Sequence, residues 1–481
     1  MKINPEIFRL YDIRGIYPQD VNEEMAYRVG RYFIHFLRKK SKKKTLTVGI
    51  ARDIRYSSPE LFRGLSKGII QEGCNIIDLG LIITPALYFA VSHLRLDGGI
   101  IITASHNPNP FNGFKLTREK TIPLSGETGI FWMRDQLAKK AFQKEKLPPL
   151  KGKIIKKNIE KDYINFVFKL NKINKKTFKK LSVAIDAGNG MGGPIFLKVL
   201  KKTGIKVYPI YCKPDGDFPN HVPDPSFGNN LKDIVSLVRK KKPNFGIILD
   251  GDADRIIFID EKGNPIRGDL ITALMAKIIL KEWKGKNKPK ILYDIRSSNV
   301  LKEVIKEDGG VPINFKIGHA LIKEKMRKDN IFFGGEVSGH YYLGQNLFYE
   351  VPFFVFLKIV NEMEKTKKTL SELIKPLQKY FHSGEIYFET KAKEGKIKEL
   401  KKKYKTGKIS EQDGLRADFK DWWFLVRPSN TEPVIKLVVE AKTRNLMEKK
   451  KKELIKNIGA PMFSRPLSYR TADLHKKKKT Y

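Results

Sequence analysis

The segment Thr103–Pro108 offers a serine hydroxyl for phosphate chemistry. It reads Thr-Ala-Ser-His-Asn-Pro and follows Gly98–Ile102, an apolar run typical of a buried β-strand. Ser105 would therefore stand on a loop at the end of a strand, where its hydroxyl could act as a nucleophile. Ser, Asn and Pro are also common turn residues, so this segment alone favours an ordinary turn. The chemical interpretation depends on three other segments.

A second segment places three carboxylates between two apolar runs. Asp250, Asp252 and Asp254 occupy alternate positions between Ile247–Leu249 and Ile256–Phe258. In an extended chain, alternate side chains point to one side. Carboxylate oxygens suit a hard divalent cation, and a phosphate nearby favours Mg²⁺. The segment therefore predicts a magnesium site.

Other arrangements compete for the same carboxylates. An EF-hand would explain Glu261 at its twelfth position, but it requires glycine where Arg255 stands and helices where the flanks predict strands. A phosphatase could use Asp250, the first residue of an Asp-x-Asp pair, as its nucleophile. An acidic hairpin turn without a metal is disfavoured, because it would bury three unpaired carboxylates together.

Three more polar segments could bind a sugar phosphate. Arg427–Pro433 combines a guanidinium, hydroxyls, an amide and loop N–H groups, which together could cradle a phosphate, although a polar hairpin loop explains it equally well. In Gly334–His340, the glycines let the backbone approach a ligand, and Glu336 and Ser338 could bond sugar hydroxyls. A glycine-rich turn is the ordinary explanation there. Phe8–Gly15 carries arginines and a tyrosine that could line an anion site, although surface arginines are the common explanation.

The elements that must hold these loops follow a repeated pattern. An apolar strand, a small-residue loop and an amphipathic helix recur from Val48, Val183 and Ile291, and a second strand starts roughly twenty positions later each time. This alternation predicts α/β domains with largely parallel strand pairing. From about Lys375 the pattern changes to helices mixed with strands near Trp423–Val426 and Val434–Glu440, which predicts a smaller α+β domain.

We therefore predict an α/β protein with three similar α/β domains, mixed but largely parallel sheets, and a C-terminal α+β domain. The predicted domains are 1–150 with the serine loop, 151–260 with the carboxylate loop, 261–372 with the glycine-rich loop, 373–465 with the Arg427 loop, and a basic tail at 466–481.

Composition narrows the class of protein. The chain has 481 residues, of which 41% are hydrophobic, and it carries no apolar leader or long apolar span, so we expect a soluble, cytoplasmic protein. The two cysteines, Cys74 and Cys212, have no spacing that suggests a disulfide framework or a zinc site. The formal charge of +42 comes from lysine clusters spread along the whole chain without interleaved aromatics. We therefore expect a solvated lysine coat with no specific nucleic acid or membrane partner, whose field would attract phosphorylated small molecules.

Taken together, the four loops resemble those of the α-D-phosphohexomutases, in particular the phosphomannomutase/phosphoglucomutase group. The resemblance runs from Phe8 to Ala441, with Thr103–Pro108 as phosphoserine loop, Asp250–Arg255 as metal loop, Gly335–His340 as sugar loop and Arg427–Pro433 as phosphate-binding loop. It implies four domains around a central cleft, each contributing one loop. It also implies interconversion of hexose 1-phosphate and hexose 6-phosphate through a phosphorylated Ser105 and a hexose 1,6-bisphosphate intermediate.

The resemblance also implies roles for single residues. Ser105 and the three aspartates would hold Mg²⁺. The residues implied to act in catalysis are Ser105, His106, Lys115, Arg255, Arg296 and His319. The residues implied to bind substrate are Tyr11, Arg14, Asn107, Glu336, Ser338, His340, Arg427, Ser429, Asn430 and Thr431. Arg296 stands where some members carry lysine, so acid/base duty and sugar contact both stay open for Arg296 and His319.

The substrate and the assembly stay partly open. Glu336-Val337-Ser338 is closer to the mannose/glucose group than to phosphoglucosamine mutases, whose sugar loop usually has Gln after Glu. Phosphoglucosamine mutase and a metal-dependent sugar phosphatase therefore remain the alternatives. Phe348–Pro352 departs from the acidic pair and glycine that many members carry after the sugar loop. We expect a monomer or a dimer.

Overall fold

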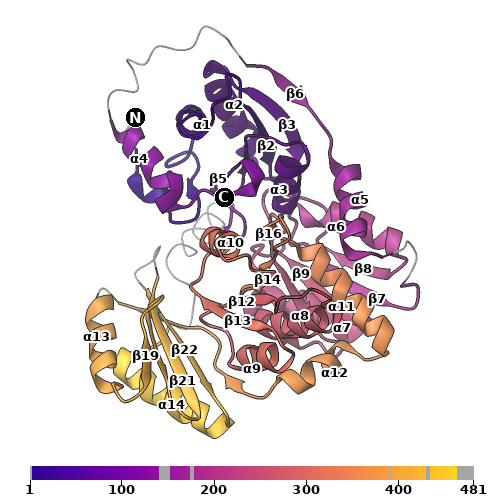
Figure 1. The fold of residues 1–481 in the computed structure, drawn as a ribbon, viewed down its shortest axis with the longest axis vertical. Helices are drawn as coiled ribbons and strands as arrows, with labels where there is room; N and C mark the ends of the chain where they lie inside the picture. Colours follow the sequence, from indigo (N-terminus) through magenta and orange to yellow (C-terminus); the bar gives the residue numbers. More distant parts are fainter. Residues whose placement is uncertain (1–2, 140–151, 174–177, 391, 430–433, 463–481) are drawn as a thin grey trace, which may run out of the picture. The chain divides into compact units, whose positions relative to one another are not determined.

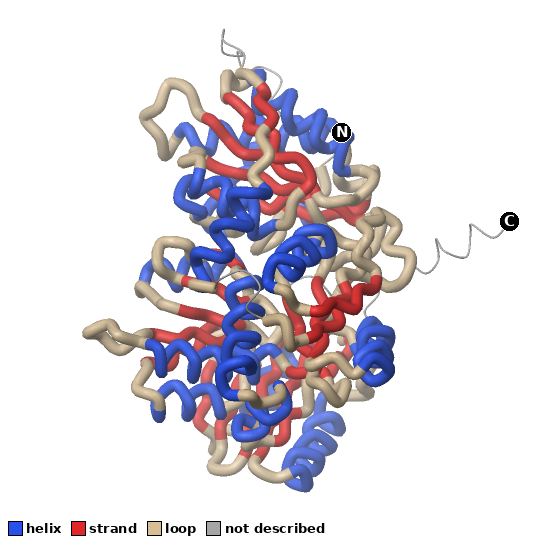
Figure 2. The backbone as a smooth tube through the Cα atoms, turned by 90° about the vertical axis from the view of Figure 1, so that its right-hand side faces the viewer, coloured by secondary structure: helices blue, strands red, loops and turns tan. Residues whose placement is uncertain are grey.

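Residues 3–139, 152–173, 178–390, 392–429 and 434–462 are described by a computed structural model. The chain divides into two units. The first holds Met1–Gly268, Gly318–Gly334 and Ser338–Leu373, and the second holds Asp269–Ile317, Gly335–Val337 and Ile374–Tyr481. Helices and strands are interspersed throughout (Figure 2). The α/β class predicted from the sequence is confirmed.

The first unit begins with a six-stranded mixed sheet in the order β1-β5-β4-β2-β3-β6 (Figure 1). Its central strand β2 pairs in parallel with β3 and β4, and β5 returns antiparallel to β4. The strands are β1 (Ile13–Ile16), β2 (Thr47–Arg52), β3 (Asn75–Leu81), β4 (Gly98–Ile102), β5 (Phe111–Arg118) and β6 (Ile154–Lys156). The helices of this part are α1 (Glu23–Arg38), α2 (Ser58–Gln71), α3 (Thr84–His93) and α4 (Phe131–Ala138).

A second sheet of the first unit repeats the same arrangement in the order β11-β10-β9-β7-β8. Strand β7 is parallel to β8 and β9, and β10 folds back antiparallel to β9. The elements are α5 (Glu160–Asn171), β7 (Ser182–Asp186), α6 (Gly192–Thr203), β8 (Lys206–Ile210), α7 (Lys232–Lys241), β9 (Phe245–Leu249), β10 (Ile256–Ile259) and β11 (Pro265–Ile266). The first unit also contains α10 (His319–Lys328), β15 (Tyr341–Leu343), β16 (Tyr349–Glu350) and α11 (Pro352–Thr366).

The second unit contains the third copy of the repeated pattern and an antiparallel sheet. Strands β12 (Lys290–Asp294) and β13 (Val311–Phe315) pair in parallel and are joined through α9 (Val300–Glu307). The antiparallel sheet has the order β17-β22-β21-β20-β19, and β18 also pairs with β22. Its elements are β17 (Phe381–His382), β18 (Ile386–Glu389), α13 (Lys393–Lys403), β19 (Lys408–Ser410), β20 (Leu415–Asp418), β21 (Trp422–Pro428), β22 (Val434–Ala441) and α14 (Arg444–Ile458). Along the chain, α8 (Gly268–Glu282), β14 (Phe333–Gly335) and α12 (Leu370–Ile374) cross from one unit to the other.

The repeated pattern predicted from Val48, Val183 and Ile291 is confirmed. Each of these residues lies in the first strand of a parallel pair, β2/β3, β7/β8 and β12/β13. In each pair a helix lies between the two strands in sequence. The C-terminal strands expected near Trp423 and Val434 correspond to β21 and β22.

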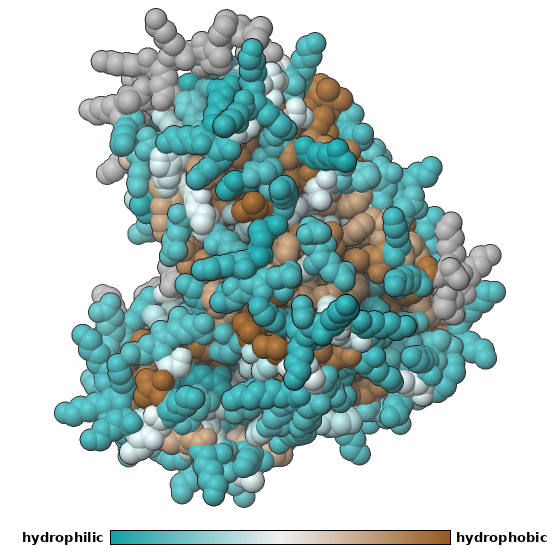
Figure 3. All heavy atoms as spheres, in the orientation of Figure 1, coloured by the Kyte–Doolittle hydropathy of each residue, from teal (hydrophilic) through white to brown (hydrophobic). Residues whose placement is uncertain are grey.

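The lysine clusters at 42–44, 240–242 and 401–403 are exposed, as expected of a solvated coat. Hydrophilic side chains cover most of the face drawn in Figure 3. Among the described residues, no helix combines the length and the apolar character needed to cross a lipid bilayer.

Close packing of α1 against α2 depends on glycine in α2. A Cβ at Gly64 would lie 2.1 Å from the carbonyl oxygen of Glu23 in α1, which is too close for any real contact. We expect Gly64→Ala to destabilise the protein by roughly 1–3 kcal/mol, because the two helices must separate. Gly395→Ala in α13 is the matched control, since a Cβ there meets no atom within 4 Å. It should be neutral or stabilise by about 0.5–1 kcal/mol. Melting temperatures test both, and equal losses would contradict the packing argument.

Candidate active site

Ser105 lies on a strained loop that follows β4. Its φ of 51° is in the left-handed region, which residues other than glycine rarely occupy. The conformation is held by a hydrogen bond of 2.8 Å from the Ser105 N–H to Oγ1 of Thr103. Ser105 is only 2% exposed. The loop predicted from the sequence is confirmed, and its backbone fixes the direction in which the Ser105 side chain leaves the chain.

Arg55 supports this loop and was missed by the sequence analysis. Its buried guanidinium donates to the backbone carbonyl oxygens of three loop residues and of Phe111, where β5 begins. The distances are 3.0 Å to Ser105, 2.6 Å to Asn107, 3.2 Å to Pro108 and 2.9 Å to Phe111. An arginine directly after a strand end, in Arg52-Asp53-Ile54-Arg55, was the only signal in the sequence.

The three aspartates lie on the turn that joins β9 to β10. The expectation of an extended chain at this point is wrong, because Ala253 adopts a positive φ of 54° and the backbone turns. The turn still brings the carboxylates together, since one oxygen of each lies within 4.8 Å of the others. A Cβ at Gly251 would lie 2.5 Å from the carbonyl oxygen of Ser105, so glycine lets the two loops approach.

Lys115 of β5 neutralises part of this charge. Its ammonium lies 2.6 Å from Oδ2 of Asp252 and 2.5 Å from Oδ2 of Asp254. Burial alone would raise the pKa of Asp254, but Lys115 and His340 hold it well below its usual range. Burial, together with the charges of Asp254 and Asp252, raises the pKa of Asp250 well above its usual value. The cluster therefore contains more negative charge than its cation partners balance.

This donor set fits a divalent metal ion. All three carboxylates are at most 1% exposed and supply oxygen ligands. Oδ1 of Asp252 is buried and has no hydrogen-bond partner in the described part of the chain. A cation would satisfy this oxygen and remove the repulsion that raises the pKa of Asp250. The aspartate triad can thus hold a metal.

The serine hydroxyl adjoins the triad. Oγ of Ser105 donates to Oδ2 of Asp250 at 2.9 Å and lies 3.0 Å from Nδ1 of His106. Nη2 of Arg255 lies 2.9 Å from the same Nδ1. Because a guanidinium can only donate, Nδ1 of His106 accepts and the neutral ring carries its proton on Nε2. Burial and the neighbouring Arg255 lower the pKa of His106 well below its usual value, which agrees with a neutral ring.

The predicted N-terminal residues reach the same site. Nη1 of Arg14 donates to Oδ1 of Asn107 at 2.7 Å, and Arg14 is also paired with Asp12. The ring of Tyr11 lies 5.9 Å from that of His319, centroid to centroid. Arg14 therefore contacts the serine loop through Asn107, and Tyr11 lies beside His319.

A buried ion pair behind His319 was also missed by the sequence analysis. Nζ of Lys323, on the same helix α10, lies 3.0 Å from Oε1 of Glu350 and donates at 3.1 Å to the Tyr88 hydroxyl. Nδ1 of His319 lies 3.9 Å from Oε1 of Glu350. Burial and the positive charge of Lys323 lower the pKa of His319 well below its usual value. The departure noted at Phe348–Pro352 thus supplies the Glu350 carboxylate for this pair.

The sugar-loop residues in the first unit face the metal loop. Nε2 of His340 lies 3.3 Å from Oδ1 of Asp254, and Nδ1 of His340 lies 3.2 Å from Oγ of Ser338. The backbone of His340 pairs with that of Arg255. The sequence alone did not predict this contact, because the two segments lie 85 positions apart.

The second unit carries a separate set of predicted residues. Arg296 donates to both oxygens of Asp294, at 3.1 and 2.8 Å, and its Nη1 lies 3.6 Å from Oε1 of Glu385. The Val337 N–H also donates to Asp294, at 2.8 Å, which anchors the chain beside the buried Glu336.

The phosphate-binding loop of the second unit begins at the end of β21. Nη2 of Arg427 lies 3.3 Å from Oδ1 of Asp413, and its buried Nε has no hydrogen-bond partner within the described ranges. Ser429 is 9% exposed. Asn430 and Thr431 lie outside the described residues. Although burial opposes it, the cations Lys436, Arg296 and Arg427 lower the pKa of Glu385 to about 2.

The first unit thus brings together the Ser105 hydroxyl, a triad of aspartates that could hold a metal, and several cations. A hydroxyl, an all-oxygen metal-binding set and fixed positive charges are the groups that phosphoryl transfer requires. Models of the phosphoglucomutase/phosphomannomutase family match the chain throughout: α/β/α domain I at residues 5–144, domain II at 161–263, domain III at 267–380, and the C-terminal domain at 385–457. The chain belongs to the phosphoglucomutase/phosphomannomutase family.

Individual relatives agree with this family. A phosphomannomutase of Methanocaldococcus jannaschii is 37% identical over 456 residues, which cover 95% of this chain and 98% of the relative. A phosphomannomutase of Escherichia coli K12 is 35% identical over 447 residues, which cover 90% of this chain and 94% of the relative. The crystal structure of a phosphoglucomutase/phosphomannomutase family protein from Burkholderia thailandensis has a TM-score of 0.83 at 26% identity and covers 96% of this chain and 99% of that one. The chain is a phosphohexomutase, an enzyme of the phosphotransferase type.

Arg55 should be required for the geometry of the serine loop. We expect Arg55→Lys to lower kcat by about 10²-fold, because one ammonium cannot replace a guanidinium that holds four carbonyl oxygens and the Ser105 hydroxyl then shifts. Arg63→Lys is the matched control, since the Arg63 side chain on α2 is 60% exposed. Mutase assays test both variants, and an Arg55→Lys enzyme with full activity would contradict the role given to Arg55.

The triad should bind a divalent cation without any substrate. We expect Mg²⁺ to raise the melting temperature, by the equivalent of about 2.7 kcal/mol when its concentration is 100 times Kd. Asp252→Asn should abolish most of this gain, because it removes a buried ligand. Asp233→Asn, on the exposed start of α7, should retain the gain. Loss of the gain in both variants, or in neither, would count against this metal site.

Proposed function

We propose that this enzyme interconverts hexose 1-phosphate and hexose 6-phosphate, of mannose, glucose or both, through a phosphoserine at Ser105 and a hexose 1,6-bisphosphate. The observation that carries the proposal is the position of the Ser105 hydroxyl, 2.9 Å from a carboxylate oxygen of a metal-binding triad. A phosphatase that uses Asp250 would give no role to this serine. Membership of the phosphohexomutase family also speaks against net hydrolysis.

The proposed reaction conserves phosphate. The P–O bond to Ser105 breaks as the free sugar hydroxyl forms a new bond to phosphorus, and the hydroxyl gives up its proton. The resulting bisphosphate then presents its other phosphate to Ser105. The second transfer restores the phosphoserine and returns a proton to the sugar oxygen, so no water is consumed.

Mg²⁺ is the cation that we propose for the triad, held by Asp250, Asp252, Asp254 and an oxygen of phosphorylated Ser105. The proposal rests on an all-oxygen donor set beside a phosphate-bearing serine. When bound, it would neutralise negative charge on the transferring group. Lys115 and Arg255 supply fixed positive charge around the same loops. Catalysis would depend chiefly on positioning and electrostatics.

For proton transfer, the chain's own residues favour His319 over Arg296. Arg296 is paired with Asp294 and Glu385, which raises its pKa further above an already basic value, although its burial alone would lower it. It therefore keeps its proton and suits contact with sugar oxygens. His319 is neutral, and its buried Nδ1 has no hydrogen-bond partner in the part of the chain described. It can accept and return a proton.

The remaining predicted residues would bind the rest of the substrate. We assign sugar hydroxyls to Glu336, Ser338 and His340. Arg14, Asn107 and Tyr11 would contact the ligand near the serine loop. The phosphate that is not being transferred would bind the loop that starts at Arg427 and Ser429. The Nε of Arg427, which has no hydrogen-bond partner among the described residues, supports an anion site there. Asn430 and Thr431 are proposed there from the motif alone.

Glucosamine phosphates are the alternative substrate class. The sugar loop reads Glu336-Val337-Ser338, without the Gln that usually follows Glu in the glucosamine enzymes. A relative named as a phosphomannomutase is 37% identical to the chain. Both observations support a neutral hexose. Sugars that differ at one hydroxyl could still share the site, so mannose and glucose are proposed together.

The proposal is tested with mannose 1-phosphate and glucose 1-phosphate, Mg²⁺ and a trace of hexose 1,6-bisphosphate. We expect both or one of the 6-phosphates to form with little inorganic phosphate. Ser105→Ala should lower the rate by about 10³-fold or more, because the phosphate carrier is lost. Ser92→Ala, at an exposed position of α3, should be unaffected.

Release of inorganic phosphate at the rate of sugar consumption would identify a phosphatase instead. Activity only on glucosamine 1-phosphate would leave the mechanism intact and replace the proposed hexose. Full activity of Ser105→Ala on any of these sugars would refute the phosphoserine mechanism.

A further inference from the structure

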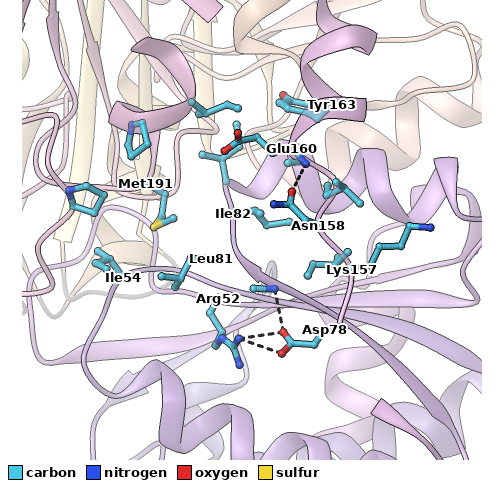
Figure 4. A pocket seen from close by; sticks show the side chains of 18 of the residues that line it. Arg52, Ile54, Asp78, Leu81, Ile82, Lys157, Asn158, Glu160, Tyr163 and Met191 are labelled. Carbon is cyan, nitrogen blue, oxygen red and sulfur yellow. Dashed lines mark hydrogen bonds and ion pairs between the residues drawn. The ribbon is translucent and has the colours of Figure 1, made fainter. Parts of the chain in front are cut away.

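A cavity in the first unit lies outside the residues assigned to substrate and metal. Its volume is about 610 Å³, and we call it the β3–α5 pocket. Its walls come from the end of β2, the end of β3, the segment 156–163 that leads into α5, and the start of α6. Figure 4 shows Arg52 and Asp78 at one end of this pocket and Tyr163 and Glu160 at the other. A cavity of this size suits a small organic molecule.

One wall of the pocket continues directly into the metal loop. Ile83 lines the pocket, and the next residue, Thr84, begins α3. The Thr84 N–H donates to the carbonyl oxygen of Asp252 at 3.0 Å, and its hydroxyl donates to Oδ2 of Asp252 at 2.6 Å. A displacement of this wall would therefore move a metal ligand.

Two other walls are joined to the catalytic loops in the same way. Met191 lines the pocket, and its N–H donates to the carbonyl oxygen of Gly251 at 2.8 Å. Ile54 lines the pocket, and the next residue is Arg55, which holds the carbonyl oxygens of the serine loop. Three separate segments of the pocket wall are thus directly connected to the serine loop or the metal loop.

The lining defines the kind of ligand. Leu81 is 53% exposed although it is a large apolar residue, and Ile82 and Tyr163 extend the apolar surface. Tyr163 is only 3% exposed, and no described residue hydrogen-bonds its hydroxyl. The pocket therefore offers an apolar wall to a ligand.

The charges of the lining favour an anion. Asp78 is paired with Arg52 at 3.1 Å, and Glu160 is paired with Lys198 at 2.7 Å, so both carboxylates are balanced. Lys156 and Lys157 also line the pocket, and neither forms an ion pair with an acidic residue of the described chain. Their positive charge is left for a ligand.

We propose that the β3–α5 pocket binds a small amphipathic anion, with an apolar body against Leu81, Ile82 and Tyr163 and its anionic group at Lys156 and Lys157. Binding there changes the position of the metal and serine loops and so changes the rate of phosphoryl transfer. The rate effect rests on the proposed function, whereas the binding site does not.

Binding is tested on the full chain by the fluorescence of 8-anilinonaphthalene-1-sulfonate, an apolar aromatic anion. Octanoate and phenyl phosphate serve as competitors and distinguish an aliphatic carboxylate from an aryl phosphate as the preferred source of this chemistry. We expect saturable binding that at least one of the two displaces. Ile82→Trp fills the pocket, and the double variant Lys156→Glu/Lys157→Glu reverses its charge. Each should weaken binding about tenfold or more, the equivalent of 1.4 kcal/mol.

The matched control is Lys153→Glu/Lys180→Glu, which makes the same charge change at exposed lysines outside the lining. It should bind like the wild type. Since Lys156 and Lys157 are exposed, their variant should fold even if Ile82→Trp does not. Equal binding by wild type, control and charge-reversal variant would overturn the proposed site.

Coupling is measured in two ways. Saturating competitor should change kcat by about fivefold or more in the wild type and not in the charge-reversal variant. It should also shift the Mg²⁺ concentration that gives half of the thermal stabilisation, because Asp252 and Gly251 adjoin the pocket walls. If the enzyme shows no mutase activity, the proposed function fails. The shift in Mg²⁺ concentration then still shows whether the pocket is coupled to the metal loop. Displacement of the dye with no change in kcat or in the Mg²⁺ concentration for half stabilisation would overturn the proposed coupling.

Discussion

Burial of three carboxylates in one turn is the constraint on which the first unit depends. Asp250, Asp252 and Asp254 repel one another away from water, and this repulsion must be offset by positive charge. Lys115 balances part of it across two strands, and the triad is completed by a divalent cation when one binds. The loop that carries Ser105 meets the same turn through Gly251, where there is no room for a side chain. The position of the Ser105 hydroxyl and the charge balance of the carboxylates thus depend on the same contact between two loops.

The two loops come from equivalent positions in two copies of the same α/β pattern. In the first two α/β repeats, one strand pairs in parallel with two neighbours, and a fourth strand returns antiparallel. The serine loop and the metal loop occupy the same place in their repeats, the connection from the third parallel strand to the antiparallel one. β4 leads to Ser105 and β9 leads to Asp250. Two copies of one pattern therefore place the Ser105 hydroxyl beside the aspartate triad.

Local patterns predicted the fold class and the loops that carry Ser105 and the three aspartates. Strand, loop and helix alternation is encoded within each segment, and so is the proximity of Asp250 to Asp254, which a single short turn determines. Contacts between distant segments were not accessible in this way. Thr84 and Asp252 are 168 positions apart, and Arg55 acts on carbonyl oxygens that no sequence pattern marks. The error at Ala253 has the same origin, since apolar flanks indicate strands but do not reveal where the chain turns between them.

The central claim is that Ser105 carries the transferred phosphate, and mass spectrometry tests it most directly. The enzyme is incubated with Mg²⁺ and glucose 1,6-bisphosphate, digested, and its peptides are sequenced. The account predicts one added phosphoryl group on the peptide that contains Ser105, at Ser105 itself, and its loss when excess glucose 1-phosphate is added. A stable phosphoryl group on any other residue, or an unmodified Ser105 in an enzyme that turns over, would contradict the account.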